Sequence, residues 1–363
     1  MRTKIKLIYG IGALFVVLAV FLLVSLPAYS GGTSDSDAYD YPIKGGTEEW
    51  KAFETHDDML RACQIPQSIL KSMSTKGLVE TVLEYPLFGN MRLYDSIQQG
   101  FEAVASQFNG LSELLNRKDA GTELLAIYSK MNPQDIEDNW GDLQRGIYAF
   151  SIAKVEILLT QNEILDDLTE IQLENLILEA RLKYTAKEQS AIYGQTGLDS
   201  TQQLIERVSQ RHYTMREYNS YVLTPKGTQV AVIVDQTEMS PGDIDWYNWY
   251  VAYYFPYAIR LTNATNKYNC HSYAWYNQTT SNNAWMPNPS AYWTDGSYAR
   301  WTGAPYVGLK VRYVVGNAHS AIIYNISNHQ YKSKWGPGPL MIHSPSYCPY
   351  IATTLYYYYR VYY

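Results

Sequence analysis

A cysteine at the expected start of a helix is the residue best placed to do chemistry in this chain. The segment Tyr268–Tyr276 reads YNCHSYAWY, and Asn269 is a residue type that commonly caps a helix N-terminus. A helix that begins there places Cys270 in its first turn, where the helix dipole and free backbone amides stabilise a thiolate and lower the pKa. Because the thiolate is the nucleophilic form of cysteine, this position suits a catalytic nucleophile.

A nucleophilic cysteine needs a general base, and a histidine further along the chain can supply it. His319 opens an expected strand over residues 318–326, with Ala321 and Ile323 on the same face. A third, polar group should orient the imidazole. The next strand, residues 331–335, offers Ser333, whereas a lysine cation beside a protonated histidine would be unfavourable. We therefore predict Cys270, His319 and Ser333 as the catalytic residues.

This order of residues resembles the papain-like cysteine hydrolases of bacterial cell-wall turnover, most closely the CHAP-type amidases and peptidases. The resemblance covers roughly residues 262–350 and rests on NCHSYAWY, AHSAIIY and the SKWG run with its downstream His343. It implies a Cys270 nucleophile and a His319 base that hydrolyse an amide bond in a peptide or in peptidoglycan through an acyl-enzyme. The chain departs from the family at Ser333-Lys334, where an acidic residue, Asn, Gln or His is usual, and in having His271 directly after the cysteine.

A second interpretation treats the same cysteine as structural. Cys270 could form a disulfide with Cys348, which leaves Cys63 without a partner and makes the protein a non-catalytic extracellular binding module. The aromatic cluster of residues 246–257 would then be either core or a surface that binds a glycan or a partner protein. A metal site from His343 and Cys348 with Cys270 is not expected, because the CxxC and HxxxH spacings of zinc sites are missing. No cofactor is expected either.

The pattern of apolar residues divides the chain into two parts. Residues 47–212 show helical spacing and predict a helical bundle, with the longest helical stretch over residues 143–192. Residues 218–363 predict short strands at 229–234, 309–315, 318–326, 331–335, 340–343 and 353–361 with turns between them. The predicted fold class is therefore α+β, an N-terminal helical bundle followed by a papain-like domain with an antiparallel sheet.

The N-terminus predicts an extracytoplasmic protein. Residues 1–30 combine a basic start, an apolar run over residues 7–26 and the small residues Ala28 and Ser30, so we interpret them as a cleaved secretion signal. The alternative is an uncleaved membrane anchor, because the apolar run is just long enough to span a bilayer. Residues 31–46, rich in Gly, Ser, Thr and Asp, are expected to form an exposed linker.

Composition limits the classes of function. The chain has 363 residues with a net charge of −6, which gives no reason to expect a nucleic-acid partner. Hydrophobic residues make up 46% of it, which excludes a wholly disordered chain. The partner that the resemblance implies is a peptide or peptidoglycan substrate, with membrane contact only through an uncleaved N-terminus.

Overall fold

The computed structural model describes residues 36–137, 139–190, 192–210, 220–234, 236, 238–315 and 318–362. Residues Ser36–Tyr363 belong to one compact unit. The predicted signal or anchor and residues 31–35 of the predicted linker lie outside the described residues. Within the described ranges, no helix combines the length and the apolar character that crossing a bilayer requires.

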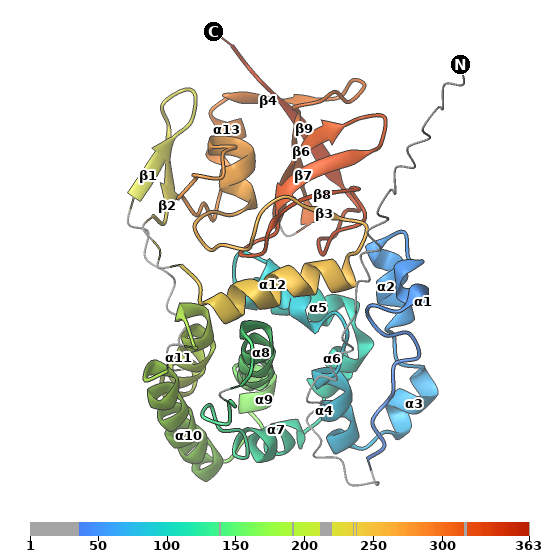
Figure 1. Cartoon of the computed structure of the whole chain (residues 1–363), viewed down its shortest axis with the longest axis vertical. Coiled ribbons are helices and arrows are strands. Elements are labelled where there is room, and N and C mark those ends of the chain that lie inside the picture. The colour runs from blue at the N-terminus through green and yellow to red at the C-terminus, as the bar shows by residue number, and fades with distance from the viewer. Residues whose placement is uncertain are drawn as a thin grey trace, which may run out of the picture. The chain divides into compact units, whose positions relative to one another are not determined.

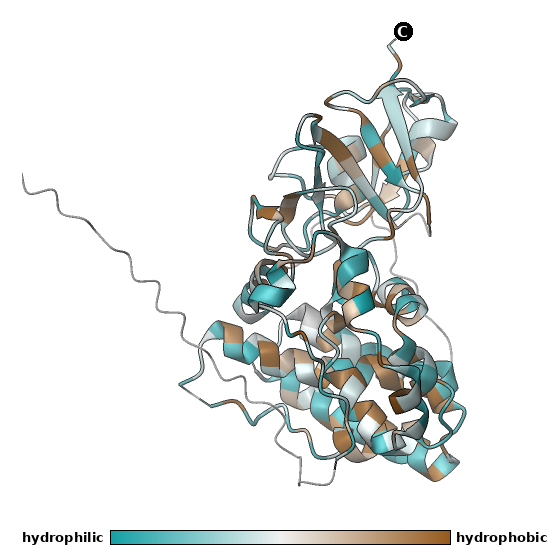
Figure 2. Cartoon of the chain, turned by 90° about the vertical axis from the view of Figure 1, so that its right-hand side faces the viewer, coloured by the Kyte–Doolittle hydropathy of each residue, from teal (hydrophilic) through white to brown (hydrophobic). Residues whose placement is uncertain are grey.

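Helices alone make up the regular structure described between residues 36 and 210. They are α1 (Glu48–Lys51), α2 (His56–Ala62), α3 (Gln67–Ser72), α4 (Thr75–Leu83), η1 (Phe88–Leu93), α5 (Ile97–Gln107), α6 (Asn109–Leu114), α7 (Ala120–Tyr128), α8 (Asp142–Leu159), α9 (Asn162–Leu165), α10 (Glu170–Glu188) and α11 (Gln195–Gln210). Polar and apolar residues alternate along them, as the teal and brown bands of Figure 2 show.

The long helical stretch predicted over residues 143–192 is three helices, α8, α9 and α10. The last of these starts at a capping box. The Thr169 side chain accepts a hydrogen bond from the Gln172 backbone N–H, and the Gln172 side chain accepts one from the Thr169 backbone N–H. The apolar residues of this stretch are therefore divided between separate helices, and Ile171 and Leu178 are exposed.

The aromatic cluster of residues 246–257 lies mainly in helix α12 (Pro241–Tyr254), which begins after a Ser240 cap with proline in the first turn. Its Trp246, Tyr247 and Tyr250 side chains are buried. The helix packs on α8, and Figure 1 shows it between the larger sheet and the helices below. Most of the cluster is thus core, as one of the two sequence interpretations held.

The second half of the chain forms two antiparallel sheets. Strands β1 (Ser220–Leu223) and β2 (Gln229–Val232) make a hairpin. A seven-stranded sheet has the order β3-β8-β7-β6-β5-β9-β4 (Figure 1). Its strands are β3 (Ile259–Arg260), β4 (Tyr298–Trp301), β5 (Lys310–Tyr313), β6 (His319–Asn325), β7 (Gln330–Lys334), β8 (Leu340–His343) and β9 (Leu355–Arg360), and the short helices η2 (Ser272–Tyr276) and α13 (Ala291–Thr294) accompany it.

These elements confirm the α+β class with an antiparallel sheet. The boundary predicted between residues 212 and 218 falls on undescribed positions, so the division into two domains stays a prediction. One hydrophobic core contains buried residues from both halves. Part of the predicted exposed linker is packed instead, because Tyr41 is buried beside Tyr85 and the Asp37 carboxylate accepts from the Ser74 backbone N–H.

Candidate active site

Cys270 lies at the start of a short helical segment, as predicted. The Asn269 side-chain oxygen accepts a hydrogen bond from the Ser272 backbone N–H at 3.0 Å, so Asn269 caps this segment. The cap places the Cys270 sulfur where it accepts hydrogen bonds from the backbone N–H groups of His271 and Ser320. The sulfur therefore lies beside the residue that follows His319 on strand β6.

Burial changes the expected state of this thiol. The Cys270 side chain is almost fully buried, at 1% exposure. Burial, followed by the nearby Asp95 carboxylate, raises the pKa of Cys270 well above its ordinary value, although the two backbone N–H groups act in the opposite direction. The prediction of a lowered pKa is therefore wrong for the structure as described, because desolvation outweighs the amides at the helix start.

His319 opens β6 and is also buried. Its ring stacks on Tyr350, with centroids 3.6 Å apart and planes 9° from parallel, and meets the Tyr313 ring edge-on. Neither ring nitrogen has a hydrogen-bond partner among the residues that the structure describes. Burial, together with the neighbouring His343 and His271, lowers the pKa of His319 well below its ordinary value. The imidazole is thus neutral, with one unprotonated ring nitrogen that can accept a proton, and its lowered pKa makes it a weaker base than an ordinary histidine.

Ser333 lies on β7, the strand that pairs with the His319 strand β6, but its side chain bonds to His343 and not to His319. Its Oγ lies 2.7 Å from His343 Nε2, and His343 Nδ1 lies 2.8 Å from the Ser344 carbonyl oxygen. Strands β7 and β8 pair Tyr331 with His343, which makes Ser333 and His343 diagonal neighbours on one face. The predicted role of Ser333, orienting His319, therefore has no hydrogen bond to support it in the described structure.

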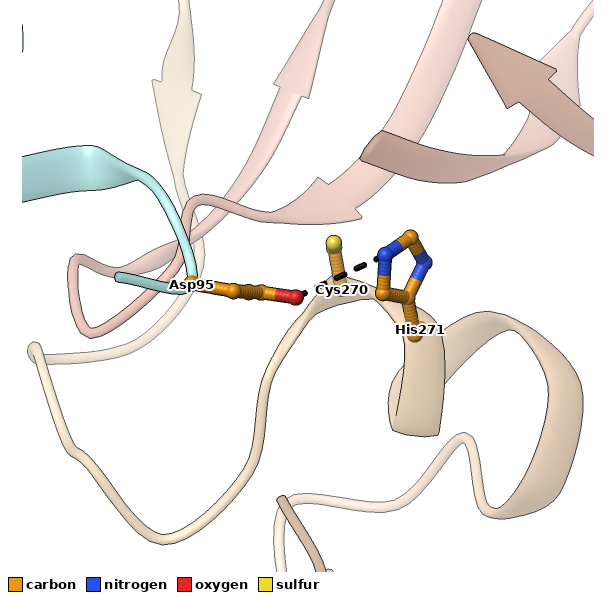
Figure 3. A group of neighbouring side chains, drawn as sticks. All are labelled: Asp95, Cys270 and His271. Atoms are coloured by element: carbon orange, nitrogen blue, oxygen red, sulfur yellow. Dashed lines mark ion pairs between the residues drawn. The ribbon is translucent and has the colours of Figure 1, made fainter. Parts of the chain in front are cut away.

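The sequence reasoning missed Asp95, which comes from the helical half of the chain. It lies between η1 and α5, and its Oδ2 accepts from Asn269 Nδ2 at 2.9 Å and lies 3.5 Å from His271 Nε2. Burial raises the pKa of Asp95 to about 7. Figure 3 shows Asp95 and His271 approaching from opposite sides with Cys270 between them. No local pattern could reveal this, because Asp95 precedes Asn269 by 174 residues.

Lys334 adds a buried amine on the same side of the sheet as Ser320. Its Nζ donates to the carbonyl oxygens of Thr265 and Gly336, each at 2.7 Å. Burial lowers the pKa of Lys334 to about 7, against the opposing influence of Cys270 and two acidic groups. The sequence analysis considered this lysine only as an unsuitable neighbour for His319.

The disulfide between Cys270 and Cys348 does not form. All three cysteines, Cys63, Cys270 and Cys348, are buried free thiols. The Cys348 sulfur instead contacts the Pro345 carbonyl oxygen at 3.4 Å and the Tyr313 hydroxyl at 3.8 Å. This removes the pairing on which the structural interpretation of Cys270 depended.

A possible metal-ligand set is present, but it differs from the one considered on sequence spacing. Asp95, Cys270 and His271 each offer one ligand atom, and these atoms all lie within 4.8 Å of one another. The set excludes His343 and Cys348.

Comparison of the chain with protein-family models, with curated proteins and with solved structures found no match.

Proposed function

We propose that the protein is a secreted cysteine hydrolase that cleaves an amide bond in a peptide or in peptidoglycan. In this proposal the α+β part is a papain-like domain and helices α1–α11 form a bundle beside it. One observation carries the proposal. A free cysteine at a capped helix start has its sulfur against the backbone N–H of Ser320, the residue that follows His319 in β6, and the ring nitrogens of this buried histidine have no hydrogen-bond partner in the described structure.

The chemistry follows from the neutral state of both residues. As Cys270 Sγ attacks the substrate carbonyl carbon, its proton passes to the unprotonated ring nitrogen of His319, and a tetrahedral intermediate forms. His319 then gives the proton to the amine as the C–N bond breaks, which leaves a thioester. A water molecule, deprotonated by the same ring, attacks the thioester, and the proton returns to the sulfur as the C–S bond breaks. The backbone N–H groups of His271 and Ser320 lie beside the sulfur and are the donors we assign to the negative charge that develops on the substrate carbonyl oxygen.

The described site is closed, so a substrate must open it. Cys270 is 1% exposed and His319 is fully buried. The segment Leu93–Asp95 connects to both residues. The Leu93 carbonyl accepts a hydrogen bond from the hydroxyl of Tyr350, whose ring stacks on His319. Asp95 accepts a hydrogen bond from Asn269, the residue before Cys270. Displacement of this segment is the simplest route by which a carbonyl carbon could reach the sulfur.

The test compares Cys270→Ser with His319→Ala and with the double variant. Each protein is incubated with peptidoglycan and with peptides, and released amines are counted. Both single variants should lose nearly all hydrolysis, and the double variant should be hardly worse, because residues that act as one unit are strongly non-additive. Cys348→Ser is the matched control, since it removes another buried thiol and should keep the activity.

The competing proposal, a non-catalytic binding module, predicts a different outcome. The burial of Cys270 and His319 favours it. If the wild type releases no amine from either substrate class while iodoacetamide leaves Cys270 unmodified in the folded protein, the hydrolase proposal fails. Circular dichroism of each variant shows whether lost activity reflects lost folding.

A further inference from the structure

Asp95, Cys270 and His271 bring the donor types of a zinc site together in one place. Thiolate, imidazole and carboxylate are all ligands of Zn²⁺, and sites with three protein ligands keep a fourth position for water or another group. The three ligand atoms here lie within 4.8 Å of one another. The residues come from two elements that are distant in sequence, the η1–α5 connection and the start of the η2 segment (Figure 3).

The separation of the histidine and carboxylate ligand atoms fits tetrahedral coordination. His271 Nε2 and Asp95 Oδ2 are 3.5 Å apart. Two light-atom ligands on a tetrahedral Zn²⁺ with bonds of about 2.0–2.1 Å are separated by about 3.3 Å. A cation could therefore lie between the ring nitrogen and the carboxylate with a shift of a few tenths of an ångström, while the sulfur completes the third corner after a somewhat larger movement.

Neighbouring side chains already orient these donors. His271 Nδ1 lies 2.8 Å from Ser320 Oγ, so the ring is held by its other nitrogen and Nε2 is turned toward Asp95. Asn269 Nδ2 holds the Asp95 carboxylate through Oδ2 at 2.9 Å. Such outer contacts are the usual support of metal-bound histidines and carboxylates.

A buried atom without a partner points to a missing ligand. Asp95 Oδ1 is buried and accepts no hydrogen bond from any residue that the structure describes. A buried carboxylate oxygen in this state costs free energy, and a cation that the carboxylate binds through Oδ1 as well as Oδ2 would remove that cost. The charges also balance, since one thiolate and one carboxylate neutralise a divalent ion. Lys334, whose charge acts on both Asp95 and Cys270, has two of its three donors on backbone carbonyls.

We propose that Asp95, Cys270 and His271 bind one thiophilic divalent cation, with Zn²⁺ the best-matched ion, and that the bound ion blocks Cys270. Binding takes the proton of the Cys270 thiol to solvent and forms the sulfur–metal bond. The same sulfur cannot then attack a carbonyl carbon. The ion also links Asp95, in the helical half of the chain, to Cys270. The blocking role rests on the proposed hydrolase function, whereas the binding of the ion does not.

The test uses the full chain, reduced and freed of metal by chelation. Calorimetric titration with Zn²⁺ should give one site per chain, and Co²⁺ should give the charge-transfer absorption of a thiolate–metal bond. Mutation of a residue that only supports a metal ligand costs about 10–100-fold in metal affinity, and loss of a ligand should cost more. Cys270→Ser and Asp95→Asn should therefore weaken Zn²⁺ binding by at least about 100-fold. Cys348→Ser is the matched control and should bind like the wild type.

The proposal has outcomes that overturn it without reference to catalysis. Absence of the thiolate–Co²⁺ band in the wild type would do so, and that measurement needs no variant to fold. An unchanged Zn²⁺ affinity in folded Asp95→Asn, or Zn²⁺ binding that leaves the rate of iodoacetamide labelling at Cys270 unchanged, would do so as well. If Zn²⁺ binds as expected but no substrate is cleaved, the site stands and the hydrolase proposal alone fails.

Discussion

Replacing Ser333 by alanine distinguishes a structural from a catalytic role for this residue. The structure bonds Ser333 Oγ to His343 Nε2 at 2.7 Å, and His319 has no hydrogen bond to it among the described residues. His343 Nδ1 is held by the Ser344 carbonyl, so the ring keeps its tautomer when the serine is lost. We therefore expect Ser333→Ala to reduce stability and to leave the chemistry of Cys270 and His319 nearly unchanged.

The size of the stability loss follows from burial. Ser333 is fully buried and His343 is 2% exposed, so the variant leaves a buried acceptor, His343 Nε2, with no donor. An unsatisfied buried group of this kind costs about 1–3 kcal/mol. For a chain of 363 residues that corresponds to a fall in Tm of about 1–4 °C.

The assay measures both quantities on the same preparations. Scanning calorimetry gives Tm, and the rate of iodoacetamide labelling of the Cys270 peptide, read by mass spectrometry, reports the nucleophile. Ser200→Ala is a matched control, because Ser200 is also buried and bonds through its hydroxyl to Glu156 at 2.6 Å, far along the chain from the site. An unchanged Tm together with a labelling rate or hydrolysis rate lower by on the order of tenfold would refute the reasoning and restore Ser333 as the residue that orients His319.

Two further predictions concern buried ionisable side chains in the helical half. Lys187→Met should lower the free energy of unfolding by about 3–5 kcal/mol, because it removes the lysine partner of the fully buried Glu156 carboxyl. The double variant Glu156→Leu/Lys187→Met should recover much of the loss in denaturant titrations. His56 has its pKa lowered to about 4 by burial, below the ordinary value of 6.5, so the unfolded chain takes up a proton that the folded one rejects. Stability should therefore fall as the pH decreases from about 6.5 to 4, and a His56→Gln variant that loses stability just as steeply would contradict this.

The sequence predicts the elements around the site because their signals are local. Strands β5 to β8 were predicted within two residues at each end, since alternating apolar residues and Gly, Pro or Asn turns mark them. The Asn269 cap was equally predictable from residue type. Helix α12 was missed, because a run of aromatic residues buried on several sides has no single apolar stripe to count.

The contacts between distant segments could not be predicted in this way. Asp95 has an ordinary sequence context just before a helix cap, and it reaches Asn269 only because helix η1 ends against the sheet. The partner of Ser333 likewise depends on the register of β7 against β8, which selects His343. A one-residue slip would turn the serine to the other face, so residue type and order along the chain do not settle its role.

Burial also decides how the proposed hydrolase would work. Position at a helix start suggested a thiolate, and the amides of His271 and Ser320 do favour one. The structure removes water from Cys270 and His319 alike, which raises the pKa of the thiol and lowers that of the imidazole. Both shifts oppose a thiolate–imidazolium pair, so the resting state has a neutral thiol and a neutral imidazole. Attack by Cys270 then requires His319 to take the proton during the step itself, and an alkylation profile of Cys270 should lack the thiolate plateau at neutral pH that an ion pair would give.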